Sequence, residues 1–319
     1  MDIDYTHIWK DGPIRDQGKV GNCHSFTTVA LLEARYFKEN YLYRAFSPYD
    51  LFINHMLETE KMFKKQRFLT HPLQEFVIYG KTKSLDGGNE FSNLKLVKKY
   101  GLALDEQQPY PAPGTEAMDE LVESVRKNSY IWRHAYHEQD IVPYNANVFK
   151  CEKVRKNIAS LYKQNALNGF YENDTREEFI EERKEVKKFV KGLKLKKTSY
   201  LGHWRGHKKE RLVSYLRCNP LVLTISNYHK LIPKDRDQRG KSSGVEVKDD
   251  LFNPPLHSVV LVGFIEGTND FLIKNSWGHQ VERYDADKFS ERVEEAAYLR
   301  RGFEKTSNCT YAENPIRYQ

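Results

Sequence analysis

The chain changes character near residue 198 of its 319 residues, and this change limits the folds open to it. Up to that point apolar residues recur at helical spacing. Beyond it come three short β-branched or aromatic runs bounded by turn residues, at 221–225, 258–262 and 271–273. Helices first and strands later predict an α+β fold rather than an alternating α/β fold.

Five stretches carry helical patterns or helix-end signals. The longest, Cys23 to Asn40, is mostly apolar and contains neither Gly nor Pro. The stretch from Thr175 to Gly192 has acids in its first turn and lysines in its last, which suits the helix dipole. The others are expected to begin after Ser47-Pro48, to span 91–100 ahead of Gly101, and to span 287–301.

The positive charge of the chain is concentrated in one segment. Residues 184–211 contain eleven Lys or Arg and two Glu, a net charge of +9 against +7 for the whole chain. A confined basic segment can bind phosphate. This one continues the helix predicted from Thr175, and no recognisable nucleic-acid-binding module accompanies it. We therefore expect a helix whose charge complements its dipole, with a surface for an anionic partner as the alternative.

The sequence offers little support for a metal, another cofactor or a membrane span. His203 and His207 are four residues apart, but no Glu lies between them and no third ligand is indicated. No apolar run approaches the roughly 18 residues of a membrane helix. The remaining thiols, Cys151, Cys218 and Cys309, show no paired spacing and are expected to be buried or incidental.

Cys23 stands where a thiol can act as a nucleophile. A turn-rich loop, 17–22, leads into the long apolar helix at this residue. The positive end of a helix dipole favours the thiolate, which is the nucleophilic form. On the same loop, the side-chain amide of Gln17 could stabilise an oxyanion together with the backbone N–H of Cys23. A lone Cys at a helix start is also a common core residue, so this position alone leaves both interpretations open.

His257 and Asn275 are expected to meet across a hairpin. His257 leads one predicted strand and Asn275 ends the next, 18 residues later. An Asn carbonyl oxygen can then hold an imidazole while the imidazole faces a cysteine.

In this combination the sequence resembles the papain-like cysteine peptidases. Four blocks match that family in order: Gln17-Gly18-Lys19-Val20-Gly21-Asn22-Cys23-His24-Ser25-Phe26; Gly87-Gly88 with Gln108-Pro109-Tyr110-Pro111; Asn219-Pro220-Leu221-Val222-Leu223; and His257 with Asn275-Ser276-Trp277-Gly278. The resemblance implies a two-lobed fold, with a helical lobe and a β-rich lobe, and hydrolysis of peptide or related amide bonds. It implies no cofactor.

The resemblance also implies roles for individual residues. Cys23 would be the nucleophile, His257 the general base and acid, and Asn275 the group that orients His257. Gln17 would complete the oxyanion hole.

Three further residues belong to the implied substrate cleft. Gly87 and Gly88 would lie along an extended substrate backbone. Trp277 would border the cleft and shield the His–Asn hydrogen bond from water.

The sequence departs from the family in several places. The family signature Cys-Gly-Ser/Ala-Cys-Trp/Tyr is here Val20-Gly21-Asn22-Cys23-His24. The family disulfide positions correspond to Val20 and Leu85, so packing is expected to replace that disulfide. His24 stands in place of an aromatic residue and is expected to be a packed spacer, with tuning of the thiolate as the alternative. The region after Gly278 lacks the aromatic, Gly-rich strand that usually follows.

The spacing of the site residues predicts an insertion. His257 and Asn275 lie farther from Cys23 than the roughly 130–150 residues typical of the family, by about 90 residues. Four parts are therefore expected: a mainly helical lobe with the nucleophile at 1–114, a helical insertion at 115–197, a β-rich lobe with His and Asn at 198–278, and a C-terminal helix and tail at 279–319.

Partners and location follow from the same features. The expected partners are a peptide or protein substrate and, by resemblance, a pro-segment inhibitor or another protein. Residues 1–5 lack the basic and apolar stretches of a signal peptide. With few cysteines, this favours a cytoplasmic protein or a delivered effector; a secreted mature form is the alternative if a leader was removed.

Two other functions stay open at this point. The motif does not distinguish water from another acceptor, so a papain-fold deamidase or acyltransferase is one alternative. The other is a catalytically weak binding module that uses the insertion as its partner surface.

Overall fold

The computed structural model describes residues 2–18, 20–55, 88–122, 175–198, 208–235, 256–279 and 281–302. The chain divides into two compact units. The first comprises Met1–Gln17, Phe26–Phe46 and Val190–Gln319, and the second comprises Gly18–Ser25 and Ser47–Phe189. Among the described residues, no helix has the length and hydropathy needed to span a bilayer.

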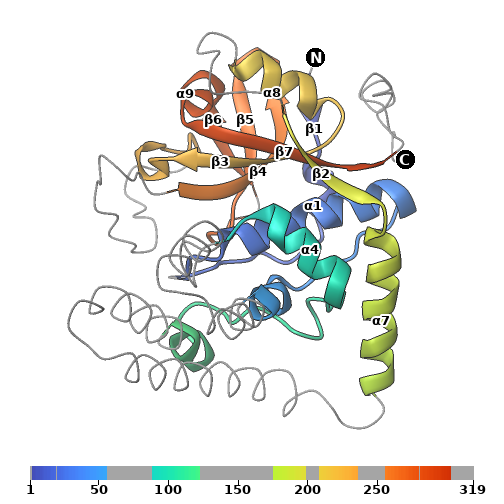
Figure 1. Ribbon diagram of the computed structural model, residues 1–319. Coiled ribbons are helices and arrows are strands. Elements are labelled where there is room, and N and C mark those ends of the chain that lie inside the picture. The colour runs from blue at the N-terminus through green and yellow to red at the C-terminus, as the bar shows by residue number, and fades with distance from the viewer. Residues whose placement is uncertain are drawn as a thin grey trace, which may run out of the picture. The chain divides into compact units, whose positions relative to one another are not determined.

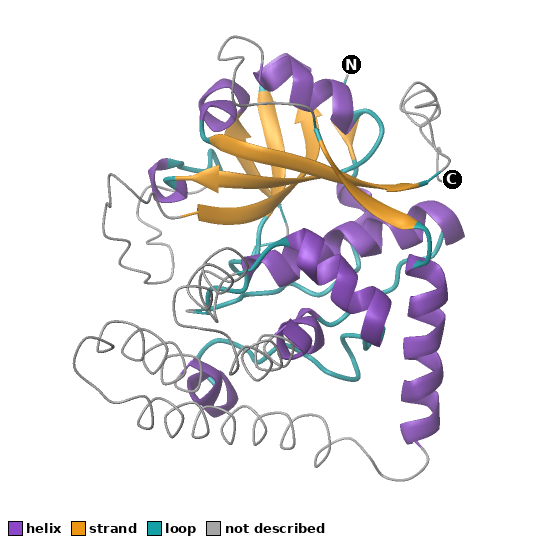
Figure 2. Ribbon diagram, in the orientation of Figure 1, coloured by secondary structure: helices purple, strands orange, loops and turns teal. Residues whose placement is uncertain are grey.

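The first unit is built on a seven-stranded antiparallel sheet (Figures 1 and 2). Its order is β2-β7-β3-β4-β5-β6, and β1 pairs with β4. The strands are β1 (Ile3–Asp4), β2 (Leu193–Lys197), β3 (Leu221–Ser226), β4 (Leu256–Ile265), β5 (Asp270–Lys274), β6 (Glu282–Asp285) and β7 (Val293–Arg301). The three predicted strands are confirmed as β3, β4 and β5, and the α+β class is confirmed with them.

β4 is long enough to pair with three strands. β3 pairs with its first part, while β5 and β1 pair with its last part from opposite sides. At Gly263 a Cβ would lie 2.7 Å from the carbonyl oxygen of Ile3 and 2.7 Å from a methyl of Leu272. Glycine is therefore needed at this position for β1 to reach β4.

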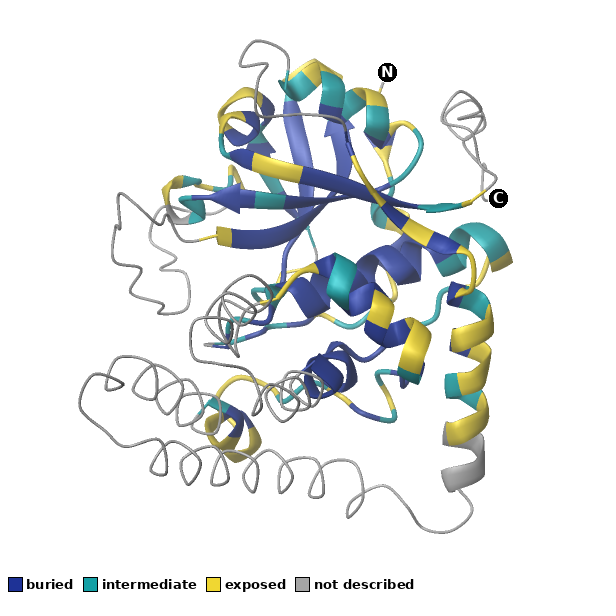
Figure 3. Ribbon diagram, in the orientation of Figure 1, coloured by how far each residue is buried: buried dark blue, intermediate teal, exposed yellow. Residues whose placement is uncertain are grey.

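Two helices cover the sheet of the first unit. α8 (Lys208–Leu216) contacts β3 and β4, and α9 (Ala286–Glu291) contacts β5 and β6. Leu212 and Leu216 of α8 are fully buried in the core. β3 and β4 are buried along nearly their whole length (Figure 3), as expected for strands whose two faces are both covered. Each such leucine stabilises the fold by about 1.5–3 kcal/mol relative to an exposed position.

The helix predicted over 287–301 is wrong for most of its length. α9 ends at Glu291, and β7 begins at Val293. Glu, Ala and Leu favour helices in isolation. Here β7 is instead paired on one side with β2 and on the other with β3, and this tertiary pairing overrides local propensity.

The basic segment is also partly a strand. Residues 193–197, expected to belong to a helical insertion, form β2, with Leu193 and Leu195 buried and Lys194 and Lys196 exposed. β2 is an edge of the sheet, and lysines on an edge strand discourage pairing with other chains. This gives part of the basic charge a structural role other than complementing a helix dipole.

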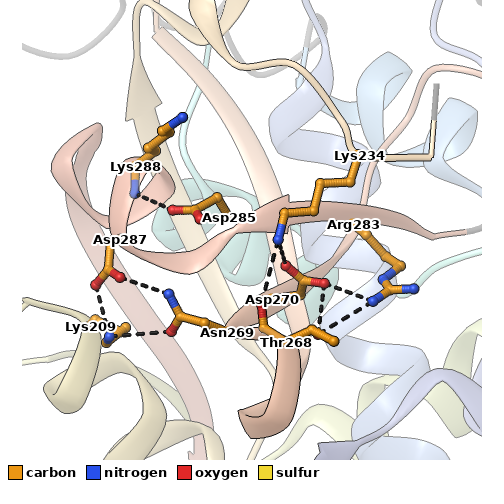
Figure 4. Close-up of polar contacts among 9 residues, drawn as sticks. All are labelled: Lys209, Lys234, Thr268, Asn269, Asp270, Arg283, Asp285, Asp287 and Lys288. Atoms are coloured by element: carbon orange, nitrogen blue, oxygen red, sulfur yellow. Dashed lines mark hydrogen bonds and ion pairs between the residues drawn. The ribbon is translucent and has the colours of Figure 1, made fainter. Parts of the chain in front are cut away.

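A polar cluster ties the turn between β4 and β5 to its surroundings (Figure 4). Asp270 accepts hydrogen bonds from Lys234, Thr268 and Arg283. Burial opposes ionisation of its carboxyl, but these donors hold the pKa of Asp270 below its usual value. Beside it, Asn269 donates to Asp287 at 2.7 Å and accepts from Lys209 of α8 at 3.2 Å.

The second unit is helical in the residues described. It contains α4 (Glu90–Tyr100) and helical residues at 48–55 and 116–122. It also contains α7 (Thr175–Val190) except for its last residue, Val190, which belongs to the first unit. As predicted, Ser47 caps a helix, its Oγ accepting from the Asp50 amide at 3.0 Å. Gly101 ends α4 with φ 76°, and a Cβ there would lie 2.4 Å from the Arg183 carbonyl oxygen of α7.

Val20 is buried in this unit against Tyr49, Phe52 and Met118. The packing expected at Val20 is therefore present, while Leu85 lies outside the described residues. The domain boundaries expected at 114, 197 and 278 stay predictions. Most of the 115–197 stretch also lies outside the described residues.

Candidate active site

His257 and Asn275 are neighbours in the first unit. His257 is the second residue of β4, and Asn275 directly follows β5. The Nε2 atom of His257 lies 2.9 Å from Oδ1 of Asn275, and both side chains are buried. An amide oxygen only accepts, so Nε2 carries the proton in this bond and Nδ1 is the basic nitrogen of the neutral ring. The hairpin contact expected from the sequence is present; the catalytic roles stay predictions.

The amide of Asn275 is fixed in one orientation by two further bonds. Its Nδ2 donates to Oε2 of Glu282 at 2.8 Å, and its Oδ1 accepts from the backbone N–H of Ser276 at 2.8 Å. A carboxylate only accepts, so the amide NH2 must face Glu282 and the amide oxygen must face His257. Glu282 is the first residue of β6, a strand that was not predicted after Gly278.

Two aromatic side chains enclose the imidazole. Trp277 stacks on His257 with ring centroids 4.3 Å apart and planes 12° apart. Tyr228, at the start of the 3-10 turn η3 (Tyr228–Lys230), lies 4.8 Å from His257 and 5.2 Å from Trp277. Apolar rings beside a hydrogen bond keep water from competing for it. Trp277 therefore lies beside the His–Asn pair, and its shielding role stays a prediction. Tyr228 was not predicted from the sequence.

Gln17 is bound to the loop that follows Asn275. Its backbone N–H donates to the carbonyl of Ser276 at 2.8 Å, and the Ser276 hydroxyl donates to Oε1 of Gln17 at 2.5 Å. Because the amide oxygen is used as an acceptor, the NH2 end of Gln17 is the end that can donate. An oxyanion hole requires that orientation.

Burial sets the protonation of His257. It lowers the pKa of His257 to about 4, because the interior penalises the imidazolium, and the bond to Asn275 offsets this only in part. The ring is therefore neutral at pH 7 in this structure.

Folding stability is expected to decline at mildly acidic pH because of His257. Its unfolded-state pKa is near 6.5 and its folded-state pKa is about 4, so the unfolded chain takes up the proton first as the pH falls. Stability is unaffected above pH 6.5 and is lost as the pH falls from 6.5 towards 4. Between about pH 7 and pH 5 the loss from His257 alone is about 2 kcal/mol.

Urea unfolding of the parent and of His257→Asn at the two pH values measures this loss. We expect the variant to lose less stability than the parent by about that amount. Equal losses in the two proteins would contradict the prediction.

Cys23 lies in the second unit as the first residue of α1 (Cys23–Asn40). Its thiol is not part of a disulfide, and the residue is half-buried. The preceding residue, Asn22, donates from Nδ2 to the Tyr110 hydroxyl at 3.0 Å, and its carbonyl accepts from the Ser25 N–H at 2.8 Å. These bonds hold the first turn of α1, whose dipole favours a thiolate.

His24, the second residue of α1, is buried. Nδ2 of Asn93 donates to Nδ1 of His24 at 2.8 Å and to its carbonyl oxygen at 2.9 Å. Burial, followed by the charge of His55, lowers the pKa of His24 well below 6.5. A neutral ring places no positive charge beside Cys23, which supports a packing role. A Cβ at Gly88 would lie 2.5 Å from a ring carbon of His24, so the Gly88 backbone lies directly against the imidazole.

Several other residues singled out in the sequence either lie outside the described residues or differ from their prediction. Gly87, His203 and His207 lie outside the described residues. Cys218 is disulfide-bonded, so the expectation of an incidental thiol is wrong at this position. Among the parts of the chain that the structure describes, no cluster of His, Cys, Asp or Glu is arranged to hold a metal ion.

The fold and these groups place the chain among proteins of the cysteine peptidase class. The family model described as papain family cysteine protease matches residues 2–286, and the chain belongs to this family. No curated protein matches the sequence significantly.

Two solved structures resemble the chain at low sequence identity. One is the cysteine protease CMS1MS2 of Carica candamarcensis in complex with E-64, with 13% identity, a TM-score of 0.44, and coverage of 94% of this chain and 98% of that one. The other is digestive procathepsin L 3 of the Tenebrio molitor larval midgut, with 15% identity, a TM-score of 0.43, and coverage of 93% and 69%.

Proposed function

We propose that the protein is an active peptidase that hydrolyses peptide bonds through Cys23, His257, Asn275 and Gln17. The observation that carries this proposal is the buried His257–Asn275 bond. It leaves Nδ1 as the basic nitrogen of the ring, on the opposite side from the group that orients it. Family membership supplies the reaction class.

The reaction would begin with attack of the Cys23 thiolate on the substrate carbonyl carbon. The Gln17 amide and the Cys23 N–H would hold the resulting oxyanion. His257, protonated in the thiolate–imidazolium pair, would donate its proton to the leaving amine, giving a thioester and a free amine. Neutral His257 would then take a proton from water, whose oxygen attacks the thioester and releases the acid and the thiol.

The negative thiolate would also change the titration of His257. Burial alone lowers the pKa of the ring, whereas a facing thiolate would raise it again. The two groups therefore would titrate as a pair.

The substrate would be a peptide or protein in extended form. Gly87, Gly88 and Trp277 would line its path. A pro-segment or another protein partner would compete for the same path.

Covalent labelling tests the proposed nucleophile. We expect an epoxide thiol probe to add once to the parent protein at Cys23, located by peptide mapping, and not to add to Cys23→Ala. Mass spectrometry of a reacted peptide would show cleavage with addition of water. Deamidation or acyl transfer without cleavage would instead favour those alternatives, and a parent never labelled at Cys23 would overturn the proposal.

A further inference from the structure

The His257–Asn275 pair is part of a longer hydrogen-bonded chain. His257 Nε2 bonds to Asn275 Oδ1 at 2.9 Å, Asn275 Nδ2 donates to Glu282 Oε2 at 2.8 Å, and the Tyr284 hydroxyl donates to the same oxygen at 2.9 Å. The residues come from β4, the end of β5, and β6, which are successive neighbours in the sheet. All four lie within the first unit.

Glu282 is an acidic residue in a buried position. Its side chain is among the buried charged groups, at 3% exposure. A buried carboxylate is costly unless it receives hydrogen bonds from its surroundings. Its partners include the Asn275 amide and the Tyr284 hydroxyl, which donate to Oε2 at 2.8 and 2.9 Å. The nearest ionisable group reached through Asn275 is the imidazole of His257.

We propose that Glu282 is a positioning residue that orients Asn275 and stabilises the protonated form of His257. This inference rests on the proposed peptidase function. Without an acceptor oxygen at this site, the NH2 end of the Asn275 amide would no longer be fixed. With a carboxylate there, the amide oxygen is held toward His257, and the negative charge polarises the amide in the direction that favours an imidazolium.

A purely structural role would have different consequences. If Glu282 only bridged β5 and β6, a neutral isostere with an acceptor oxygen would keep the strands together and leave catalysis unchanged. A positioning role requires the charge itself to matter, because a negative charge near the ring would stabilise His257 as the imidazolium of the thiolate–imidazolium pair.

The experiment compares Glu282→Gln with Tyr284→Phe and the parent. Glu282→Gln keeps the shape and an acceptor oxygen but removes the charge. We expect its kcat to fall about ten-fold with KM little changed, as for loss of part of the acid–base contribution. We also expect the alkaline limb of its kcat/KM profile to move to lower pH by about half a unit or more, because the imidazolium loses a nearby negative charge.

Tyr284→Phe is the matched control. It removes one hydrogen bond to Glu282 but keeps the charge and the bond to Asn275, so its alkaline limb should match that of the parent. A folded Glu282→Gln protein with parental kcat and a parental alkaline limb would overturn the inference. Absence of Cys23-dependent turnover in the parent would instead refute the proposed function, so the two failures are distinguishable.

Glu282→Asp covers the case in which Glu282→Gln does not fold. Aspartate keeps the charge but withdraws the carboxylate by one methylene. We expect the alkaline limb to stay near that of the parent while kcat falls, because the contact to Asn275 is lengthened. A parental kcat, or a limb displaced to lower pH, would overturn the inference.

Discussion

Replacing His257 by alanine is expected to reduce kcat for peptide hydrolysis by about 10⁴-fold, the upper range for general acid–base catalysis. Under the proposed mechanism, the substitution would remove the proton donor for the leaving amine and the base for the attacking water. It also removes the partner that would hold Cys23 as a thiolate. Steady-state kinetics on a fluorogenic peptide measures the loss.

Two controls separate chemistry from folding. Tyr228→Phe keeps an aromatic ring beside His257 and should retain near-parental turnover. Added imidazole should restore part of the activity of His257→Ala if a cavity is left beside Trp277. A folded His257→Ala protein that keeps more than a tenth of parental kcat would show that another residue acts as the base.

Replacing Gln17 by alanine is expected to lower kcat/KM by about 10²–10³-fold, as is typical for removal of one oxyanion donor. The backbone bond from Gln17 to the Ser276 carbonyl does not depend on the side chain, so the loop should stay in place. Most of the loss should therefore appear in kcat, with the fold intact by circular dichroism.

The Ser276–Gln17 bond provides a graded series. Gln17→Glu is nearly isosteric but replaces the donor with an acceptor, so it should be at least as damaging as alanine. Ser276→Ala keeps the Gln17 amide but removes the hydroxyl that orients it, so its loss should be smaller. Activities of the three variants within threefold of the parent would rule out Gln17 as an oxyanion donor.

The elements predicted well are those specified by local signals. α1 was predicted from Cys23 to Asn40 because a turn-rich loop precedes an uninterrupted apolar run, and the structure has those bounds. The β4–β5 hairpin is predicted because two successive β-branched or aromatic runs are bounded by turn residues, with His257 leading the first and Asn275 ending the second. Both patterns act over neighbouring residues, so sequence alone is enough.

The missed elements depend on partners distant in sequence. β7 was read as a helix because its alanines, glutamates and leucine favour helices, and only its pairing with β2 and β3 selects a strand. Glu282 was missed for a related reason. An isolated glutamate in a polar stretch usually faces solvent, and nothing nearby in the sequence shows that its strand lies beside β5, which ends at Lys274.

The short strand β1 bears on how the first unit assembles. His257, Asn275 and Glu282 are linked by contacts spanning 18 and 7 residues, whereas the Ser276–Gln17 contact closes 259 residues of chain. Closing the longer loop costs about 2 kcal/mol more in chain entropy than closing the 18-residue one. The pairing of Ile3 with Phe264 closes a loop of similar length, so the two contacts share that cost in the folded protein. With β1 paired to β4, only short segments of chain separate this pairing from Gln17 and from Ser276, so the contact that aligns Gln17 becomes a local one.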